Sequence, residues 1–380
     1  MITALIFLLV LSILVFAHEL GHFWTARRLG VKAEEFGFGF PPRAFGFYKD
    51  KTGHWRHFWG NRLLEKLPAG QEPAGTVYSI NWLPIGGFVR IKGENGEGKQ
   101  ETDSFAAQSL WRRALILAAG VFMNIVLAAV LLSVGYMIGL PQSLDGVGKS
   151  AHITQAQVIV METLPDSPAQ KAGLQAGDVI AAVNNEAIDS YERLQALAAE
   201  HQNQTVNFLI KRDSQEKQVE MTPVVIASTG KPGIGVSIYA SGTVRYPFFL
   251  AIWEGIKMTG LMFWAIIVAF AGLIHSLFIG ANVSGEVAGP VGIATLTGQV
   301  ARLGFAYLLQ FVALLSLNLA LINILPFPAL DGGRLFFLLL EKIKGRPVRP
   351  SMEAWINLIG FWLLILLIVF VTYKDILRLF

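Results

Sequence analysis

The chain has no cysteine at any of its 380 positions. Disulfide bonds and thiolate metal sites are therefore excluded, and any metal ion would need histidine and carboxylate ligands. Charge is also scarce, because 15% of the residues are charged whereas a soluble globular domain carries about 25%. With 53% hydrophobic residues and a mean hydropathy of +0.50, the composition is typical of a membrane protein.

The first apolar stretch, residues 1–28, lacks the basic residues that begin a signal peptide. Its first basic residues, Arg27 and Arg28, follow the apolar run, and no small-residue cleavage site comes after them. We therefore predict a retained membrane helix with its N-terminus outside and its other end in the cytoplasm. The net charge of +4 is modest, and Lys and Arg gather beside apolar segments, which indicates membrane topology and no nucleic-acid partner.

Four segments are each long enough, at about 20 residues, to cross the hydrocarbon layer. They are predicted at residues 1–28, 110–140, 305–326 and 353–374, and the basic stretch between the last two is predicted to be cytoplasmic. Residues 245–280 are apolar as well, but a fifth crossing would put that basic stretch outside the cell. We therefore predict interfacial, amphipathic helices there.

Residues 18–22 read His-Glu-Leu-Gly-His inside the first apolar segment. On a helix, His18 and His22 lie one turn apart on one face, so that both imidazoles can reach one metal ion. Glu19 would stand beside the ion, where it can take a proton from a bound water. Ionisable groups in a membrane helix are energetically expensive, which favours a zinc site over two histidines that are merely satisfied in the core.

A third ligand has to come from elsewhere, and Asp331 is the best candidate. Pro326 and Pro328 cannot continue a helix, so the third span is expected to break there and to continue as far as Arg334. A helix that is interrupted inside a membrane leaves backbone carbonyl groups without partners, which implies a cavity or a ligand at that place. Taken alone, Asp331 would be better explained as the N-cap of the helix predicted over residues 332–344.

Depth in the membrane gives an independent argument for the metal role of Asp331. His22 lies five residues before Arg27, about 8 Å below the cytoplasmic boundary at 1.5 Å per residue. Asp331 lies three residues before Arg334, also toward the cytoplasmic side. With four spans the two halves of the site therefore share one depth, whereas with five they would lie on opposite faces.

Residues 151–240 have the short apolar runs of a soluble domain. Strands are predicted at Val158–Met161, Val179–Val183, Val206–Ile210 and Val219–Met221, and a helix at Tyr191–Glu200. The passage from Asp166 to Asn184 resembles the core of a PDZ domain of the bacterial protease-associated kind. Such domains bind extended peptides by adding a strand to their sheet. A spacer that binds nothing is the alternative, since fold alone does not establish ligand binding.

The predicted cytoplasmic loop, residues 29–109, is more than a polar linker. Aromatic and small residues alternate over residues 36–48, and Val77–Ile80 and Gly86–Ile91 look like further strands. Non-helical backbone near a membrane is tolerated only where protein or water surrounds it. We predict a re-entrant β-structure beside the His18 helix; an aromatic interfacial anchor is the alternative.

These three motifs together resemble the site-2 protease family of intramembrane zinc metalloproteases, in its bacterial RseP- and RasP-like branch. The motifs are the His-Glu-Leu-Gly-His segment, the PDZ signature and the sequence Asn-x-x-Pro-x-Pro-x-Leu-Asp-Gly that begins at Asn323. The resemblance covers essentially the whole chain. Some relatives carry two PDZ domains in tandem, whereas this chain has room for one.

The resemblance implies both residue roles and an activity. It implies zinc ligation by His18, His22 and Asp331, catalysis by Glu19 and substrate binding by Asn323, and it assigns Gly86, Gly87 and Phe88 to the re-entrant β-structure. Asn318, Gly86, Gly87 and Phe88 are further candidates for substrate binding. Asn318 is the weaker member, because it lies about 140° around an ideal helix from Asn323.

Such enzymes cut the transmembrane segments of single-pass proteins, including anti-sigma factors and signal-peptide remnants. The expected fold is a polytopic α-helical membrane protein with four transmembrane helices, a re-entrant β-structure and one extracytoplasmic PDZ domain. The expected location is the bacterial cytoplasmic membrane, with the active site near its cytoplasmic side. Peptides or substrate ectodomains would bind the PDZ domain.

Two other functions fit part of the pattern. A metal transporter could use His18, His22 and Asp331 as a transit site, but transport needs neither Glu19 nor a PDZ domain, and it predicts further ionisable groups along the spans. An inactive scaffold relative would normally have lost a ligand or the base, and all four residues are present.

Overall fold

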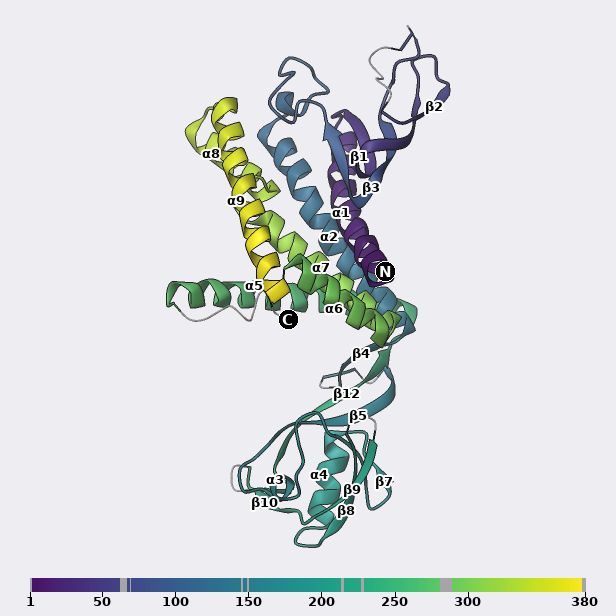
Figure 1. The fold of residues 1–380 in the computed structure, drawn as a ribbon, viewed down its shortest axis with the longest axis vertical. Helices are drawn as coiled ribbons and strands as arrows, with labels where there is room; N and C mark the ends of the chain where they lie inside the picture. Colours follow the sequence, from purple (N-terminus) through teal and green to yellow (C-terminus); the bar gives the residue numbers. More distant parts are fainter. Residues whose placement is uncertain are drawn as a thin grey trace. The chain divides into compact units, whose positions relative to one another are not determined.

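A computed structural model of the chain describes residues 2–61, 67–68, 70–144, 146–148, 150–212, 215–226, 229–280 and 289–377. The chain forms two compact units. One comprises Met1–Ser133 with Gly255–Phe380, and the other comprises Val134–Glu254. The first is built mainly of helices and the second mainly of strands (Figure 1).

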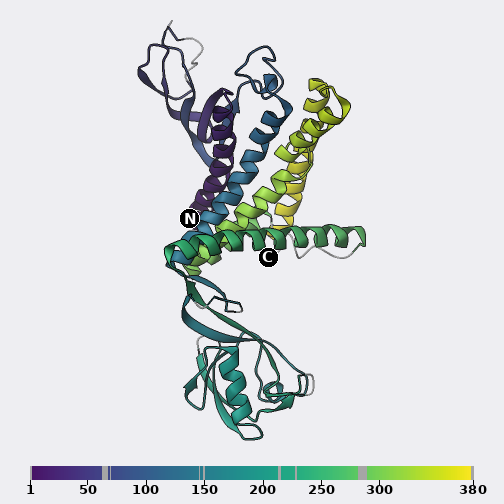
Figure 2. The ribbon, with the colours of Figure 1, turned by 180° about the vertical axis from the view of Figure 1, so that it is seen from behind.

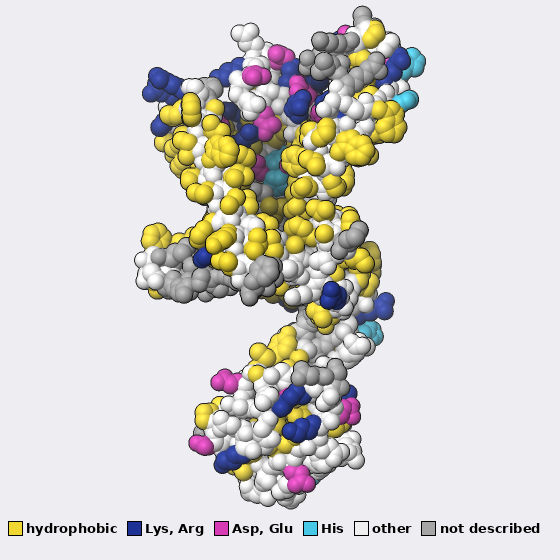
Figure 3. Space-filling view, in the orientation of Figure 1, with side chains coloured by type: hydrophobic (Ala, Val, Ile, Leu, Met, Phe, Trp, Pro, Cys, Tyr) yellow, Lys and Arg dark blue, Asp and Glu magenta, His cyan; other side chains and the backbone are white. Residues whose placement is uncertain are grey.

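Long apolar helices make up most of the first unit. The helices are α1 (Ile2–Arg28), α2 (Leu110–Ile138), α5 (Phe248–Phe278), α6 (Pro290–Leu303), α7 (Phe305–Ile324), α8 (Asp331–Lys344) and α9 (Pro350–Leu377). Within the described residues, α1, α2, α5, α7 and α9 are each long and apolar enough to cross a membrane. Figure 3 shows apolar side chains covering the visible sides of these helices, with charged side chains gathered beyond one end. The unit is therefore that of a polytopic membrane protein.

Helix α5 differs from the sequence prediction. Where several interfacial helices are predicted, the structure has one continuous helix of 31 residues. Its length and hydropathy match those of a membrane span, so the predicted count of four spans does not follow from the helices alone. Only 6% of its most apolar stretch is buried, and Figure 2 shows it running crosswise to α1, α2 and α9.

A three-stranded sheet follows α1. It consists of β1 (Ala33–Lys49), β2 (Trp55–Trp59) and β3 (Val77–Ile91) in the order β2-β1-β3. Residues of β1 pair twice with β3: Phe36 lies opposite Val89 and also opposite Tyr78. Both halves of β3 therefore pair with β1. The second half of β3 has β1 as its strand partner on one side.

The sheet packs against α1. The Ser12 hydroxyl of α1 donates to the carbonyl oxygen of Pro84 at 2.7 Å and accepts from the backbone N–H of Gly86 at 3.3 Å. Gly86 has φ +78°, and a Cβ there would lie 2.7 Å from the side chain of Val15. Glycine is needed both for this backbone conformation and for this close approach. The structure thus has β-structure beside the His18 helix, as the sequence predicts.

The second unit is a sheet with one long helix. Its strands are β4 (Leu140–Ser143), β5 (His152–Thr163), β6 (Val179–Val183), β7 (Glu186–Ala187), β8 (Val206–Arg212), β9 (Gln215–Met221) and β12 (Val236–Arg245), in the order β4-β12-β5-β6-β8-β9 with β7 beside β6. The hairpin β10 (Val224–Ile226) and β11 (Lys231–Gly233) and the helices α3 (Pro168–Lys171) and α4 (Tyr191–Glu200) complete it. Each of the four predicted strands and the predicted helix is present, while β4 precedes the predicted domain and β12 runs past its end.

One buried ion pair holds the middle of this unit together. The Asp178 carboxylate is 1% exposed and accepts from Arg212 Nε at 2.6 Å and Nη2 at 2.7 Å. The backbone N–H of Gln175 also donates to it, at 2.9 Å. Burial raises the pKa of Asp178, but the bonds from Arg212 and Gln175 outweigh burial, and the pKa of the carboxyl is lowered.

We expect Asp178→Asn to destabilise the second unit by about 3 kcal/mol, because Arg212 loses its buried partner. Since the pKa of Asp178 is lowered on folding, its contribution is present above the unfolded pKa of about 3.9 and is lost as pH falls through the folded value. Pulse proteolysis of the full chain across a urea series measures the change. Glu216→Gln is the control, because its ion pair with Lys211 is largely exposed; an equal loss in both variants contradicts the prediction.

Candidate metal centre

Helix α1 brings two imidazoles together inside the first unit. The side chains of His18 and His22 are buried, and their Nε2 atoms lie 3.2 Å apart. Helix α2 passes very close: a Cβ at Gly21 would overlap the Ala119 carbonyl oxygen, and a Cβ at Gly120 would overlap both imidazole rings. Two glycines, one on each helix, therefore make room for the rings.

Helix α2 also orients the two rings. Nδ1 of His22 lies 2.8 Å from the carbonyl oxygen of Ile116, so this nitrogen carries the proton and the Nε2 lone pair is free. Nδ1 of His18 lies 3.3 Å from the side-chain amide of Asn124, which is fully buried. Amide oxygen and nitrogen can be interchanged, and Asn124 Oδ1 otherwise has no partner among the described residues. With Oδ1 turned to His18, both imidazoles present an Nε2 lone pair to the same point.

Asp331 completes the cluster from the far end of the chain. Its Oδ2 lies 2.9 Å from Nε2 of His18 and 3.2 Å from Nε2 of His22. Asp331 is the first residue of α8, and the N-cap position belongs to Leu330. The alternative role of Asp331 as a helix N-cap is therefore not the one found in the structure.

The break before α8 has the expected cause. Helix α7 ends at Ile324, just before Pro326 and Pro328. A Cβ at Gly332 would overlap the carbonyl oxygen of Leu325, so glycine is required for the chain to turn into α8. The turn puts the first residue of α8 beside α1.

The three ligand atoms fit a zinc ion. A tetrahedral zinc site with bonds of about 2.0–2.1 Å needs ligand atoms about 3.3 Å apart, close to the 2.9–3.2 Å found here. Asp331 Oδ2 is buried and receives no hydrogen bond from the described residues. Two lone pairs and a carboxylate oxygen that face one another are stabilised by a cation between them. Within the described residues, these three form the one cluster of His, Asp and Glu with metal-ligand spacing.

Glu19 lies beside this cluster and outside it. Its Oε2 accepts a hydrogen bond from the backbone N–H of Val89 on β3 at 3.1 Å. This bond ties the carboxylate to the sheet and leaves the other oxygen available. Glu19 is not part of the group with metal-ligand spacing, and a carboxylate beside such a group can serve as a proton acceptor.

The residues predicted to bind substrate have no contact with His18, His22 or Asp331 among the described residues. Gly86 and Gly87 lie against α1, and Phe88 stacks on Phe40 of β1. The amide of Asn318 donates to the carbonyl oxygen of Leu314 in its own helix, at 2.9 Å. Asn323 is half-buried near the end of α7. No contact ties either asparagine to the three ligands within the described residues.

Sequence reasoning missed the contribution of α2 and of Val89. Asn124 carried a usable signal, because it is the one side-chain amide in a long apolar helix, where a polar group is expensive. Gly120 and the carbonyl of Ile116 carried none, since their roles depend on which face of α2 meets α1. Val89 acts through its backbone, so its identity could not reveal the bond to Glu19.

We expect Gly120→Ala to lower the zinc content of the purified protein at least about 10-fold, although no ligand is changed. Alanine normally favours a helix over glycine by about 1 kcal/mol, so loss of metal would come from the methyl group displacing the two rings. Elemental analysis of the detergent-solubilised protein measures it. Gly260→Ala on α5 is the matched control, because its Cβ meets nothing within 4 Å; full zinc occupancy in Gly120→Ala would show that the rings have room to move.

Comparison with known proteins agrees with this geometry. The model of peptidase family M50 matches residues 6–59 and 63–367. The regulator of sigma-W protease RasP of Bacillus subtilis (strain 168) is 28% identical over 100% of this chain and 99% of that protein. A putative zinc metalloprotease of Clostridium perfringens (strain 13 / Type A) is 33% identical over 97% of each chain.

A solved PDZ domain of an SdrC-like protein from Listeria monocytogenes is 27% identical over 23% of this chain and 92% of that domain. Its TM-score of 0.21 is too low to carry an argument. The family match, in contrast, takes in both α1 with its two histidines and α8 with Asp331. The chain therefore belongs to peptidase family M50 and is a zinc metalloprotease of a bacterial membrane.

Proposed function

We propose that this metalloprotease cuts transmembrane segments of single-pass membrane proteins, with His18, His22 and Asp331 holding zinc and Glu19 acting as the base. The observation that carries the proposal is the convergence of three ligand atoms within 3.2 Å, beside a carboxylate, in a unit of apolar helices. Figure 3 shows a hollow between two apolar faces of this unit in which histidine and acidic side chains are visible. A substrate helix in the same membrane could enter such a hollow sideways.

The chemistry divides between the metal and the protein. Zinc bound by these residues would act as a Lewis acid on the scissile carbonyl and lower the pKa of a bound water toward about 7. Glu19 takes the proton from the attacking water and later gives it to the leaving amine. The bond from the Val89 N–H holds one oxygen of Glu19, so the other is oriented for both transfers.

A substrate helix hides its carbonyls in its own hydrogen bonds, so it has to unwind before it can be cut. An extended segment could pair with the edge of β3, which runs past Glu19. The amide of Asn323 could bind a peptide group next to the cut. Asn318 supports this role less well, because its amide is bonded within its own helix.

The class of substrate is suggested by the relatives. One of them is named a regulator of sigma-W protease, which points to control of a sigma factor in that organism. By analogy, anti-sigma factors with one transmembrane segment are proposed as substrates here, and remnants of signal peptides present the same apolar helix.

The PDZ-like unit offers a groove for a peptide. A cavity of about 100 Å³ lies beside α4, lined by apolar residues that include Leu164, Leu194 and Ile238. An extended segment of a substrate ectodomain would pair with a strand there and place an apolar side chain in this cavity. Binding at this groove would select substrates before they reach the zinc.

We propose that α1, α2, α7 and α9 cross the membrane and that α5 lies along its outer surface. The crosswise direction of α5 supports this arrangement (Figure 2). It keeps the basic stretch after α8 in the cytoplasm, places the PDZ-like unit outside, and puts the zinc site near the cytoplasmic side.

Substitution of the base and of a ligand should separate the two roles. Glu19→Gln is expected to keep zinc and to slow cleavage of a single-pass substrate at least about 100-fold. Asp331→Asn is expected to lose both zinc and cleavage. Zinc content and cleavage are measured on the same detergent preparations, with the exposed Glu34→Gln on β1 as control. Cleavage by Glu19→Gln at the wild-type rate would rule out the proposed base.

The absence of cysteine allows a direct test of topology, because each single-cysteine variant has one thiol. Glu200→Cys in α4 is expected to react with a membrane-impermeant maleimide in intact cells. Lys344→Cys at the end of α8 is expected to react only after the membrane is opened. If α5 crosses the membrane, Lys344→Cys will react in intact cells, and the four-span arrangement is wrong.

A further inference from the structure

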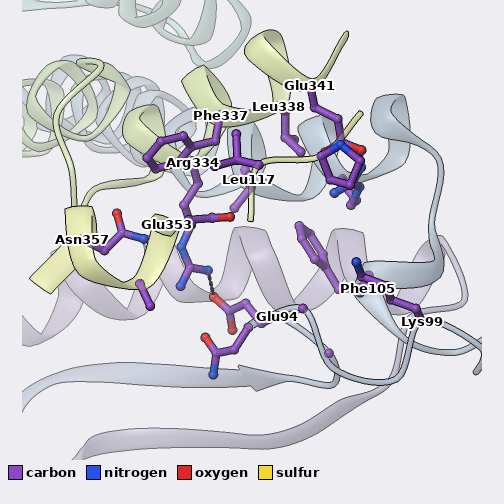
Figure 4. A pocket seen from close by; sticks show the side chains of 18 residues that line it. Glu94, Lys99, Phe105, Leu117, Arg334, Phe337, Leu338, Glu341, Glu353 and Asn357 are labelled. Atoms are coloured by element: carbon purple, nitrogen blue, oxygen red, sulfur yellow. Dashed lines mark hydrogen bonds and ion pairs between the residues drawn. The ribbon is translucent and has the colours of Figure 1, made fainter. Parts of the chain in front are cut away.

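Two ion pairs attach α8, the helix that begins with Asp331, to the rest of the first unit. Arg334 pairs with Glu94, which follows β3, and Arg113 of α2 pairs with Glu341 at 2.6 Å. Both pairs line a cavity of about 340 Å³, and Figure 4 shows the Arg334–Glu94 pair in its wall. The Arg334 and Glu94 side chains are 29% and 30% exposed, and the other pair is more buried, at 15% and 17%.

The Arg334–Glu94 pair connects α8 to the segment that follows β3, the strand whose backbone contacts Glu19. Arg334 is three residues after Asp331, so the two side chains are neighbours on one face of α8. Glu94 lies three residues after Ile91, where β3 ends. Two positions before Ile91, the backbone of Val89 holds the carboxylate of Glu19. The pair therefore joins the strand that holds the proposed base to the helix turn that carries the proposed ligand.

Apart from Arg334, the first turn of α8 is held through backbone contacts, since Gly332 and Gly333 are buried against carbonyl groups that follow α7. Residues 325–330 before it have no helix or strand, and the backbone N–H of Ala329 donates to Asn357 of α9 at 3.1 Å. The apolar contacts of α8 come later, where Leu335 and Leu338 pack against the core beneath β3. Rotation or sliding of the first turn would shift Asp331 against the two imidazoles, and the Arg334–Glu94 pair opposes that movement.

We infer that Arg334 and Glu94 are positioning residues, which set the carboxylate of Asp331 at the distance from His18 and His22 that zinc requires. The inference rests on the proposed ligand role of Asp331. An ion pair that is about one third exposed contributes little to overall stability. Its removal is therefore expected to appear in metal affinity, with the folded state intact, as is found for groups that orient metal ligands in other proteins.

The test measures zinc affinity by competition with a chelator, using the full chain in detergent. Arg334→Gln and Glu94→Gln are each expected to weaken zinc binding about 10-fold or more. The exchanged pair, Glu94→Arg with Arg334→Glu, is expected to bind zinc more tightly than either single variant. Glu341→Gln is the matched control on the same helix, and its zinc affinity is expected to stay within about 2-fold of wild type, since it lies away from the first turn.

Each alternative outcome has a distinct meaning. Wild-type zinc affinity in Arg334→Gln or Glu94→Gln overturns the inference. An equal loss of zinc affinity in Glu341→Gln also overturns it, because the general packing of α8 would then be the cause. A raised KM with unchanged zinc affinity overturns it as well, because Arg334 would then act on the substrate. Asp331→Asn, measured in the same experiment, separates the ligand role of Asp331 from the positioning role of Arg334 and Glu94. If it keeps zinc, the ligand assignment fails; if it alone loses zinc, the assignment stands and the positioning role fails.

Discussion

A polar group without a partner is very costly inside a membrane, and the structure of this protein is organised around meeting that cost at His18, His22 and Asp331. Their three facing atoms lie within 3.2 Å of one another, at the spacing that a shared cation would satisfy. Their outward-facing atoms need partners as well, and Ile116 and Asn124 of α2 supply these for the two imidazoles. The proposed metal site thus depends on three helices, α1, α2 and α8, and not on the His-Glu-Leu-Gly-His segment alone.

The polar groups of the site can reach their partners only if the backbones of α1 and α2 approach each other closely. Gly21 and Gly120 remove the side chains that would otherwise separate α1 from α2 at the level of the rings. The Ser316 hydroxyl of α7 then donates to the backbone carbonyl of Asn124 at 2.8 Å, which adds the third helix at the same depth. Close packing of small residues and short polar bonds replaces the hydrophobic effect, which does not drive helices together in lipid. Helix α7 ends at Ile324, and the turn that follows brings Asp331 back to the histidines.

Much of this site could be read from the sequence, because its main signals are local. The spacing of His18 and His22 needs only the helix period, and the break before Asp331 needs only the two prolines. The bond from Asn124 to His18 and the bond from Val89 to Glu19 join residues 106 and 70 positions apart. No local pattern encodes which face of α2 or which backbone N–H of β3 meets α1. The count of four spans stays a prediction for a related reason: α5 has the length and hydropathy of a span, and neither property separates a crossing helix from an interfacial one.

The contact between Glu19 and β3 connects the chemistry to the way a substrate would be held. A strand edge with free N–H groups is unfavourable next to lipid, yet an unwound substrate needs such an edge for its own backbone. Here the Val89 N–H is already occupied, because it donates to the Glu19 carboxylate. On the proposed mechanism, the base therefore marks one fixed position along β3, and a substrate strand can pair only in registers that leave this bond in place. The position of the cut would then be set by the register of the substrate on β3, since Glu19, and with it the metal ligands of α1, is tied to one residue of that strand.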